Sequence, residues 1–469
     1  MNLSSKLPES ISFRGCTMLR KTCSGLWAIT VALALAACGG SSSSNSSTSS
    51  NSPSPSASQP GGSGNSGGSG GTGGSGTGSG GGSGSANSGT TQYVYVANQE
   101  TFNVSGYKVN ADGTLTPVPG SPYSVPGSAP HIFDPTYLAV VGNFLYASGS
   151  DSSSSNGITG FKINSADGSL TRFNASQGDA GAYQFLSADR QRGIIYASGA
   201  GPQAKGSSNL IAGISAFKVN SDGTLTLTGG QVQPVTATPP GTTPVAGSLA
   251  VDTQGRFLFD FFFNKIHVFP RNADGSLGTE VSGSPFTAGT PYTFSSPDDA
   301  NACFLDDQDP VIVADNAGRF VYTSCDSNAE VDVFSVANSG QLSLVGTVPN
   351  SGPQSELSSL ALSHDGSVLF GTQEERNQVL AFSIDRNTGM PALASTISAG
   401  TRPNSAAVDV SNHFLYVTNG SSNISKNNDH EGSSNMSEYM VTPAGMMTQL
   451  PGSPIATGAA PKAVVVASF

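Results

Sequence analysis

The sequence is short of charge, and basic residues are its scarcest charged class. Only 11% of its 469 residues are charged, with 20 Lys and Arg against 31 Asp and Glu. A protein that binds nucleic acid needs a basic surface to neutralise phosphates, so nucleic acid is excluded as a partner. The acidic balance instead favours cations or neutral ligands.

Signatures of several common sites are also missing. The only tryptophan, Trp27, lies in an N-terminal apolar segment, and five histidines are spread along the chain. After residue 91 there is no Gly-x-Ser-x-Gly nucleophile motif and no Cys-x-x-Cys-His haem motif. A serine hydrolase of the usual kind and a haem protein are therefore not indicated.

The N-terminus has the pattern of an export signal. Two cations, Arg20 and Lys21, precede an apolar run from Leu26 to Ala37, which is shorter than the about 20 residues that span a bilayer. We therefore expect a signal peptide over residues 1–37, with Met18 as a possible true start. Leu35-Ala-Ala-Cys38 resembles the bacterial lipobox, which implies that Cys38 is lipidated. Gly39 after it implies an outer-membrane anchor in the cell envelope.

Residues 39–91 form a tether in this interpretation. They contain 18 Gly and 20 Ser among 53 residues, a composition that cannot bury enough apolar surface to fold. We expect a flexible segment over 38–91 that holds a folded domain, residues 92–469, away from the membrane.

The rest of the chain repeats one unit seven times. Each copy has a short apolar strand with a central aromatic residue, a variable loop, a second strand and a glycine turn. The central aromatics are 46 to 63 residues apart, at Tyr95, Tyr146, Tyr196, Phe259, Tyr322, Phe370 and Tyr416. This period, with strand signals throughout, predicts an all-β, seven-bladed β-propeller with four-stranded blades.

A further strand precedes copies two to seven but not copy one. Its counterpart occurs at the end of the chain, from Lys462 to Phe469. The simplest arrangement inserts this C-terminal strand into the first blade and closes the ring, because closure pairs both exposed edges.

The repeats resemble the lactonase-like seven-bladed propellers, which include bacterial 6-phosphogluconolactonase, and the related YVTN-repeat surface proteins. Tyr416-Val-Thr-Asn419 is that tetrapeptide, and Tyr95-Val-Ala-Asn98 is a near copy. The resemblance implies a pocket lined by an arginine and a glutamate. In the best-matching stretch Glu374 stands at the arginine position and Ser359 at the glutamate position, which weakens the catalytic interpretation.

Propeller topology brings two kinds of loop to one face: those that follow the second strand of a blade and those that enter its first strand. The former are long at Ser148 to Gly157, Ser198 to Ile211 and Thr418 to Asn435. Long loops on a rigid scaffold commonly carry binding, although neutral variation at tolerated sites explains them equally well.

Two cysteines remain once the N-terminal ones are set aside. Cys303 and Cys325 flank one blade on this face, so a disulfide is expected in an oxidising compartment, with two free thiols as the alternative. Acidic residues crowd the same blade, and hard cations such as calcium prefer clustered oxygens. A solvated acidic loop is the commoner explanation, so no cofactor is expected. The acidic residues are Asp298, Asp299, Asp306, Asp307 and Asp309.

The function expected from these features is a monomeric, lipid-anchored propeller whose looped face binds a protein or small molecule. The alternative is a hydrolase of sugar lactones, with His131 as general base and Arg376 or Arg402 stabilising the oxyanion. All three of these residues fall in loops of that face. A structural spacer in the envelope is a second alternative.

Overall fold

The computed structural model describes eleven ranges of the chain, all of them after residue 89. They are residues 90–125, 137–148, 157–175, 182–202, 210–232, 247–262, 264–289, 311–325, 330–349, 357–422 and 430–469. Regular structure in these ranges consists of β-strands, and no helix in them has the length and hydropathy needed to cross a membrane. The signal, the tether and Cys38 lie outside the described residues.

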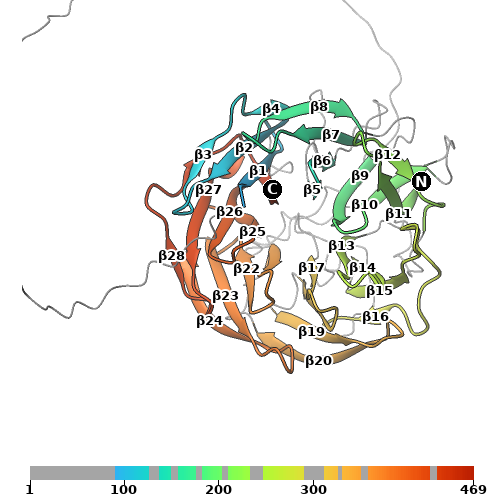
Figure 1. The fold of residues 1–469 in the computed structure, drawn as a ribbon. Helices are drawn as coiled ribbons and strands as arrows, with labels where there is room; N and C mark the ends of the chain where they lie inside the picture. Colours follow the sequence, from blue (N-terminus) through green and yellow to red (C-terminus); the bar gives the residue numbers. More distant parts are fainter. Residues whose placement is uncertain are drawn as a thin grey trace, which may run out of the picture. The chain divides into compact units, whose positions relative to one another are not determined.

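Seven antiparallel sheets surround a common axis and confirm the predicted seven-bladed propeller (Figure 1). Blade one contains β30 (Pro461–Ser468), β1 (Gln92–Asn98), β2 (Asn103–Val109) and β3 (Leu115–Pro117), with β4 (Tyr123–Ser124) also paired to β2. Blade two contains β5 (Leu138–Val141), β6 (Phe144–Ser148), β7 (Ile158–Ile163) and β8 (Leu170–Asn174). Blade three contains β9 (Ala182–Asp189), β10 (Ile194–Pro202), β11 (Leu210–Val219) and β12 (Leu225–Leu227).

The remaining four blades follow the same order from the inside outward. Blade four contains β13 (Ser248–Val251), β14 (Phe257–Phe262), β15 (Lys265–Pro270) and β16 (Phe286–Thr287), and blade five contains β17 (Val311–Ala314), β18 (Phe320–Cys325), β19 (Glu330–Val336) and β20 (Leu342–Pro349). Blade six contains β21 (Ser359–Leu362), β22 (Val368–Gln373), β23 (Gln378–Ile384) and β24 (Pro391–Ser398). Blade seven contains β25 (Pro403–Val408), β26 (Phe414–Ser422), β27 (His430–Val441) and β28 (Met447–Gln449), and β29 (Ile455–Ala456) also pairs with β27.

The last strand of the chain closes the ring, as the sequence predicted. β30 pairs antiparallel with β1, with Tyr95 opposite Val465. Thr91 and Phe469 exchange both of their backbone hydrogen bonds, at 3.1 and 2.9 Å. Figure 1 shows the C-terminus beside β1 near the axis. Blade one is therefore built from both ends of the propeller.

The central tyrosines of four second strands bind their blade to the next one. Their hydroxyls donate to the carbonyl of the glycine in the outer turn of the following blade. These pairs are Tyr95 with Gly168 (2.8 Å), Tyr146 with Gly223 (2.7 Å), Tyr196 with Gly275 (2.9 Å) and Tyr416 with Gly113 (3.0 Å). The last of these pairs joins blade seven to blade one, so the same contact also spans the closure.

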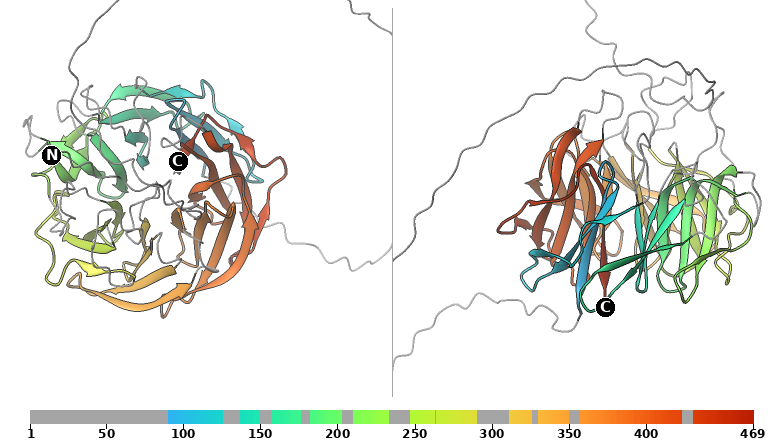
Figure 2. Two further views of the ribbon diagram at one scale, coloured as in Figure 1. Left: turned by 180° about the vertical axis from the view of Figure 1, so that it is seen from behind. Right: turned by 90° about the horizontal axis from the view of Figure 1, so that it is seen from above.

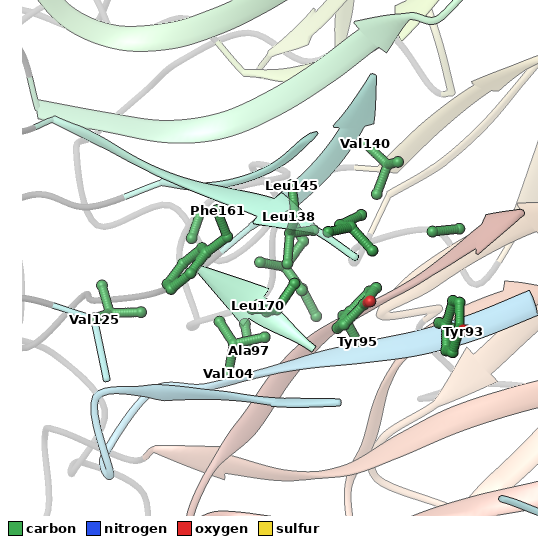
Figure 3. Packing of buried hydrophobic residues seen from close by; sticks show 14 of the residues in the cluster. Tyr93, Tyr95, Ala97, Val104, Val125, Leu138, Val140, Leu145, Phe161 and Leu170 are labelled. Atoms are coloured by element: carbon green, nitrogen blue, oxygen red, sulfur yellow. The ribbon is translucent and has the colours of Figure 1, made fainter. Parts of the chain in front are cut away.

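The core lies between adjacent blades, where the apolar faces of their sheets pack together. Figure 3 shows one such layer, a single buried cluster that contains Tyr93 and Tyr95 of blade one and Leu145 and Phe161 of blade two. Tyr93 and Tyr95 are completely buried. Successive side chains of a strand point to opposite faces of its sheet, and each face packs against a neighbouring blade. Both sets of side chains are therefore apolar, and the second strands are nearly continuous apolar runs.

The two faces of the ring differ in the segments that they carry. We call the loop face the side where second strands end and first strands begin, and the turn face the opposite side. The strands of each blade run between these two faces (Figure 2, right). Every segment from a second to a third strand, or from one blade to the next, therefore leaves from the loop face.

Two of the long loops predicted for this face are partly strand. β26 and β27 stay paired out to Ser422 opposite His430, and β10 and β11 stay paired out to Pro202 opposite Leu210. The prediction of irregular loops from Thr418 and from Ser198 was wrong over these stretches. Glycines and serines there obscured the strand signal, although a two-stranded extension satisfies the backbone groups of such a sequence.

Candidate functional site

Three neighbouring blades bring charged side chains together on the loop face. Glu374 and Glu375 follow β22 of blade six, Arg402 directly precedes β25 of blade seven, and Lys462 is the second residue of β30 in blade one. β25 lies next to both β21 and β30, so the segments are adjacent in space. Residues 88 positions apart in sequence thus share one part of the inner rim.

Arg402 holds the two glutamates of blade six. Its Nε lies 2.5 Å from Oε1 of Glu374, and its Nη1 lies 3.9 Å from Oε1 of Glu375. Glu374 is only 5% exposed, whereas Glu375 is 54% exposed. The buried pair is the stronger interaction, because its charges are shielded least by solvent.

The backbone at this pair adopts an unusual conformation. Arg402 has φ of 59° and Asn377 has φ of 53°, both in the left-handed region that favours glycine. The Arg402 N–H donates to Oδ1 of Asn377 at 2.8 Å, and its carbonyl accepts from Gly420 N–H at 2.9 Å. These bonds hold the strained arginine backbone in place.

Left-handed residues other than glycine gather on the loop face. Among the described residues other than glycine, six have positive φ, and five of these lie in loop-face segments: Phe102, Asn264, Asn377, Arg402 and Ala460. The sixth, Asn412, lies in a turn of the opposite face. Such strain persists where the surroundings enforce it and is concentrated at functional sites.

Burial raises the pKa of Glu374 above its ordinary value. The positive charges of Arg402 and Lys462 and the hydrogen bond from Arg402 oppose this effect, and the charge of Glu375 adds to it. Burial and the two cations thus act on the pKa of Glu374 in opposite directions. A carboxyl group in such an environment at the rim is suited to proton transfer.

Asparagines of the two tetrapeptides brace the loop face. Nδ2 of Asn419 donates to Oδ1 of Asn435 at 2.8 Å, and Nδ2 of Asn98 donates to Oδ1 of Asn103 at 2.7 Å. Oδ1 of Asn98 also accepts from the Gly458 N–H at 3.1 Å. The tetrapeptide asparagine therefore ties the segments on either side of its strand together, which is a structural role.

Only part of the predicted catalytic set lies in the described residues. Arg402 joins the charged group described above, and Arg376 lies exposed in the same turn as Glu374. His131 lies outside the described residues, so its role as general base stays a prediction. Ser359, at the glutamate position, has its hydroxyl 2.8 Å from that of Thr372 on the adjacent strand.

The disulfide and the calcium site also remain predictions. Cys303 and the five predicted acidic ligands, Asp298, Asp299, Asp306, Asp307 and Asp309, lie outside the described residues. Cys325 ends β18, but its side chain is not described. Within the ranges that are described, no three His, Cys, Asp or Glu side chains are grouped as a metal site requires.

A second ionisable group lies buried between blades three and four. Asp260 and His267 are opposite each other on β14 and β15, and both are completely buried. Oδ1 of Asp260 accepts from Gly247 N–H at 2.7 Å, and Nδ1 of His267 lies 3.0 Å from Oε1 of Glu280. Within the described part of the chain, no group forms a hydrogen bond with Oδ2 of Asp260 or with Nε2 of His267.

Burial raises the pKa of Asp260 to about 7, although the charge of His267 and the bond from Gly247 act to lower it. Neither Asp260 nor His267 was predicted from the sequence as part of a site. A usable signal was present, since Asp260 and His267 interrupt the otherwise apolar stretches Phe257–Phe262 and Ile266–Phe269.

Comparisons with known proteins match this architecture. The model of the family described as lactonase, 7-bladed beta-propeller, matches residues 144–291 and 311–429. A search of curated proteins finds no match. Among solved structures, a candidate 6-phosphogluconolactonase from Bacteroides fragilis is 16% identical, with 81% of this chain and 99% of that chain covered and a TM-score of 0.61.

The periplasmic gluconolactonase of Pseudomonas aeruginosa is similar at 17% identity, with 81% of this chain and 99% of that chain covered and a TM-score of 0.58. At these identities the structural likeness establishes the fold. The family match covers more than half of the chain and confirms the resemblance inferred from the tetrapeptides. The chain belongs to the lactonase family of seven-bladed β-propellers.

Proposed function

We propose that the protein hydrolyses sugar lactones at the part of the loop face formed by blades six, seven and one. The observation that carries this proposal is the buried Glu374 held by the strained Arg402 at the inner rim, with the charge of Lys462 acting on the same carboxyl. Family membership supports the choice of lactones over other esters.

The residues have the chemistry that hydrolysis requires. Glu374 takes a proton from water as the water oxygen bonds to the lactone carbonyl carbon, and the charge that develops on the carbonyl oxygen is stabilised by the nearby cations Arg402 and Lys462. The bond between that carbon and the ring oxygen then breaks. The protonated Glu374 returns its proton to the ring oxygen, which leaves an aldonic acid.

Arg402 supplies the cation that the sequence comparison placed in doubt. The family's arginine position holds Glu374, but the guanidinium of Arg402 reaches the same place from the next blade, 2.5 Å from the Glu374 carboxylate. The negative charge of Glu374 at the family's arginine position is therefore compensated by the positive charge of Arg402, 28 positions later.

The test is lactone hydrolysis above the spontaneous rate, measured for the wild type and for Glu374→Gln. Loss of a general base lowers kcat by about 100-fold or more, and we expect a loss of this size in a variant that is still folded at the assay temperature, although the broken buried ion pair lowers its melting temperature. Glu438→Gln is the matched control, because Glu438 is a glutamate of similar burial between blades seven and one. Full activity in Glu374→Gln would remove this residue from the mechanism, and a wild type inactive on a panel of aldonolactones would exclude the function.

We further propose a location in the cell envelope. The signal-like residues 18–37 and the lipobox-like Leu35–Cys38 support export and lipid anchoring, and the similar Pseudomonas aeruginosa protein is periplasmic. Binding of a partner at the loop face stays a prediction, and the family match favours lactone hydrolysis over it.

A further inference from the structure

Asn377 is bonded to both segments that carry the ion pair of the candidate site. It closes the turn that follows β22, where its N–H donates to the carbonyl of Glu374 at 3.4 Å. Its own carbonyl accepts from the N–H of Ala399 at 2.8 Å, and its Oδ1 accepts from the N–H of Arg402 at 2.8 Å. One residue of blade six therefore links the turn of Glu374 to the segment that carries Arg402.

Three successive N–H groups before β25 donate to side-chain oxygens. The pairs are Gly400 with Ser437 (3.3 Å), Thr401 with Ser433 (2.9 Å) and Arg402 with Asn377 (2.8 Å). Both serines belong to β27 of blade seven. Among these three acceptors only Asn377 comes from blade six, so it is the one that fixes the Arg402 backbone relative to Glu374.

The conformation of Asn377 explains why an asparagine suits this position. Its φ of 53° lies in the left-handed region, which asparagine tolerates better than most residues other than glycine. Asparagine also carries an acceptor oxygen on a short side chain, whereas glycine allows the same backbone without any acceptor. The backbone requirement and the hydrogen bond can therefore be separated by substitution.

We propose that Asn377 is a positioning residue for the hydrolysis, which holds the guanidinium of Arg402 at Glu374. This inference rests on the proposed lactonase function and adds to it a residue that contacts neither the substrate nor the reacting atoms. Asn377 acts through Arg402, so its loss should weaken what Arg402 does for the oxyanion and for the general base.

Release of Arg402 changes the proton affinity of Glu374. Burial raises the pKa of this carboxyl group, the positive charges of Arg402 and Lys462 and the hydrogen bond from Arg402 lower it, and the charge of Glu375 raises it. Arg376 lies exposed in the same turn. A guanidinium that moves away lowers the pKa of Glu374 less, so the base stays protonated and inactive up to a higher pH.

The experiment measures kcat and KM for glucono-δ-lactone, above the spontaneous rate, as a function of pH for the wild type and Asn377→Gly. Glycine adopts a φ of 53° without strain, so this variant removes the acceptor and keeps the backbone. We expect kcat at its upper plateau to fall about three- to tenfold, the effect of one hydrogen bond, with little change in KM. The acid limb of the kcat profile should move to higher pH.

Asn412→Gly is the matched control on the turn face. Asn412 also has a left-handed backbone, with φ of 61°, and its N–H donates to the carbonyl of Asp409 at 3.0 Å. Its Oδ1 accepts from the N–H of His364, so it too joins blade seven to blade six, at 2.6 Å. We expect both glycine variants to lose similar stability in urea unfolding, and only Asn377→Gly to change kcat and its pH profile.

Asn377→Asp is the conservative variant, because aspartate keeps an acceptor oxygen and tolerates the left-handed backbone. Its plateau kcat should stay within about twofold of the wild type, although its added charge also moves the acid limb to higher pH. A plateau as low as that of Asn377→Gly would mean that the hydrogen bond to Arg402 is not what matters.

The results that contradict the inference differ from those that contradict the lactonase function. A folded Asn377→Gly with wild-type kcat and acid limb, or equal losses of kcat in both glycine variants, would overturn the positioning role and leave the function intact. A wild type that hydrolyses no aldonolactone would overturn the function together with the inference drawn from it.

Discussion

At the residue scale, the buried Asp260 makes the stability of the propeller depend on pH. Its pKa in the folded protein is about 7, above the ordinary value of 3.8. The folded state therefore binds a proton more tightly than the unfolded chain, so stability is highest below pH 4 for this group and falls as pH rises towards and through 7. The groups that act on it are His267, Glu280 and the Gly247 N–H.

Asp260→Asn tests this dependence. We expect wild-type stability relative to the variant to fall by an amount on the order of a few kcal/mol between pH 5 and pH 8, since each pKa unit corresponds to about 1.4 kcal/mol. Urea unfolding at both pH values measures it. Glu438, whose pKa is also raised to about 7, is present in both proteins and cancels in the comparison. Parallel pH profiles would show that Asp260 does not titrate in this range.

The residues of the candidate site could be predicted only in part from the sequence. Arg402 could be proposed because it precedes a predicted first strand, and Glu374 because it aligned with a family position. Their ion pair depends on a left-handed arginine and on a contact between blades, and neither leaves a signature in local composition. Lys462 was placed correctly in the closing strand, but its proximity to Glu374 follows from ring closure rather than from any motif.

At the scale of the element, the outer turns carry the contact between blades. Gly168 has φ of +76°, and a Cβ added there would lie 2.3 Å from Cδ1 of Tyr93 in the preceding blade. Equivalent glycines of other blades meet Phe414, Phe144, Ile194, Phe257 and Phe320 in the same way. The glycine is thus required both by the turn and by the close approach of a neighbouring side chain.

Two glycine-to-alanine substitutions separate these requirements. Gly193 has φ of +67°, and no atom of the described residues lies within 4 Å of a Cβ added there, so Gly193→Ala should cost about 1 kcal/mol from backbone strain alone. Gly168→Ala adds an overpacked contact, typically about 1–3 kcal/mol more. Chemical denaturation of both variants measures the difference. Equal losses would mean that Tyr93 moves aside without cost.

Strand positions were the most predictable elements. Second strands such as Phe144–Ser148 and Val368–Gln373 begin with at least three apolar residues shortly after a turn with glycine, so their type and starting position could be predicted. The extensions of β26 and β10 could not be predicted from the sequence, because Gly420, Gly199 and neighbouring serines have low strand propensity. Their pairing is supported by the opposite strand rather than by intrinsic preference.

At the scale of the whole molecule, stability depends on the pairing of β30 with β1. Removal of residues 461–469 would expose the edge of β1 and the apolar side chains of Val94, Tyr95 and Val96, which are fully buried in the intact ring. Exposed edges and apolar surface promote association between chains. We expect the truncated protein to melt at least about 10 °C lower, and to aggregate, because several buried side chains each contribute about 1.5–3 kcal/mol.

Differential scanning fluorimetry and light scattering measure these changes. Deletion of residues 81–89 is the control of equal length, because it shortens the segment before β1 and leaves every residue of the β1–β30 ladder in place. Addition of the peptide 461–469 to the truncated protein should restore part of the lost stability. A truncated protein as stable and soluble as the full chain would contradict the closure.

The order of synthesis gives this closure a further consequence. The ribosome makes β1 more than 360 residues before the strand that completes its blade. Blade one therefore stays incomplete throughout translation, and the ring cannot finish folding until the final residues have emerged. A premature stop codon before β30 therefore yields a product whose first blade lacks its inner strand.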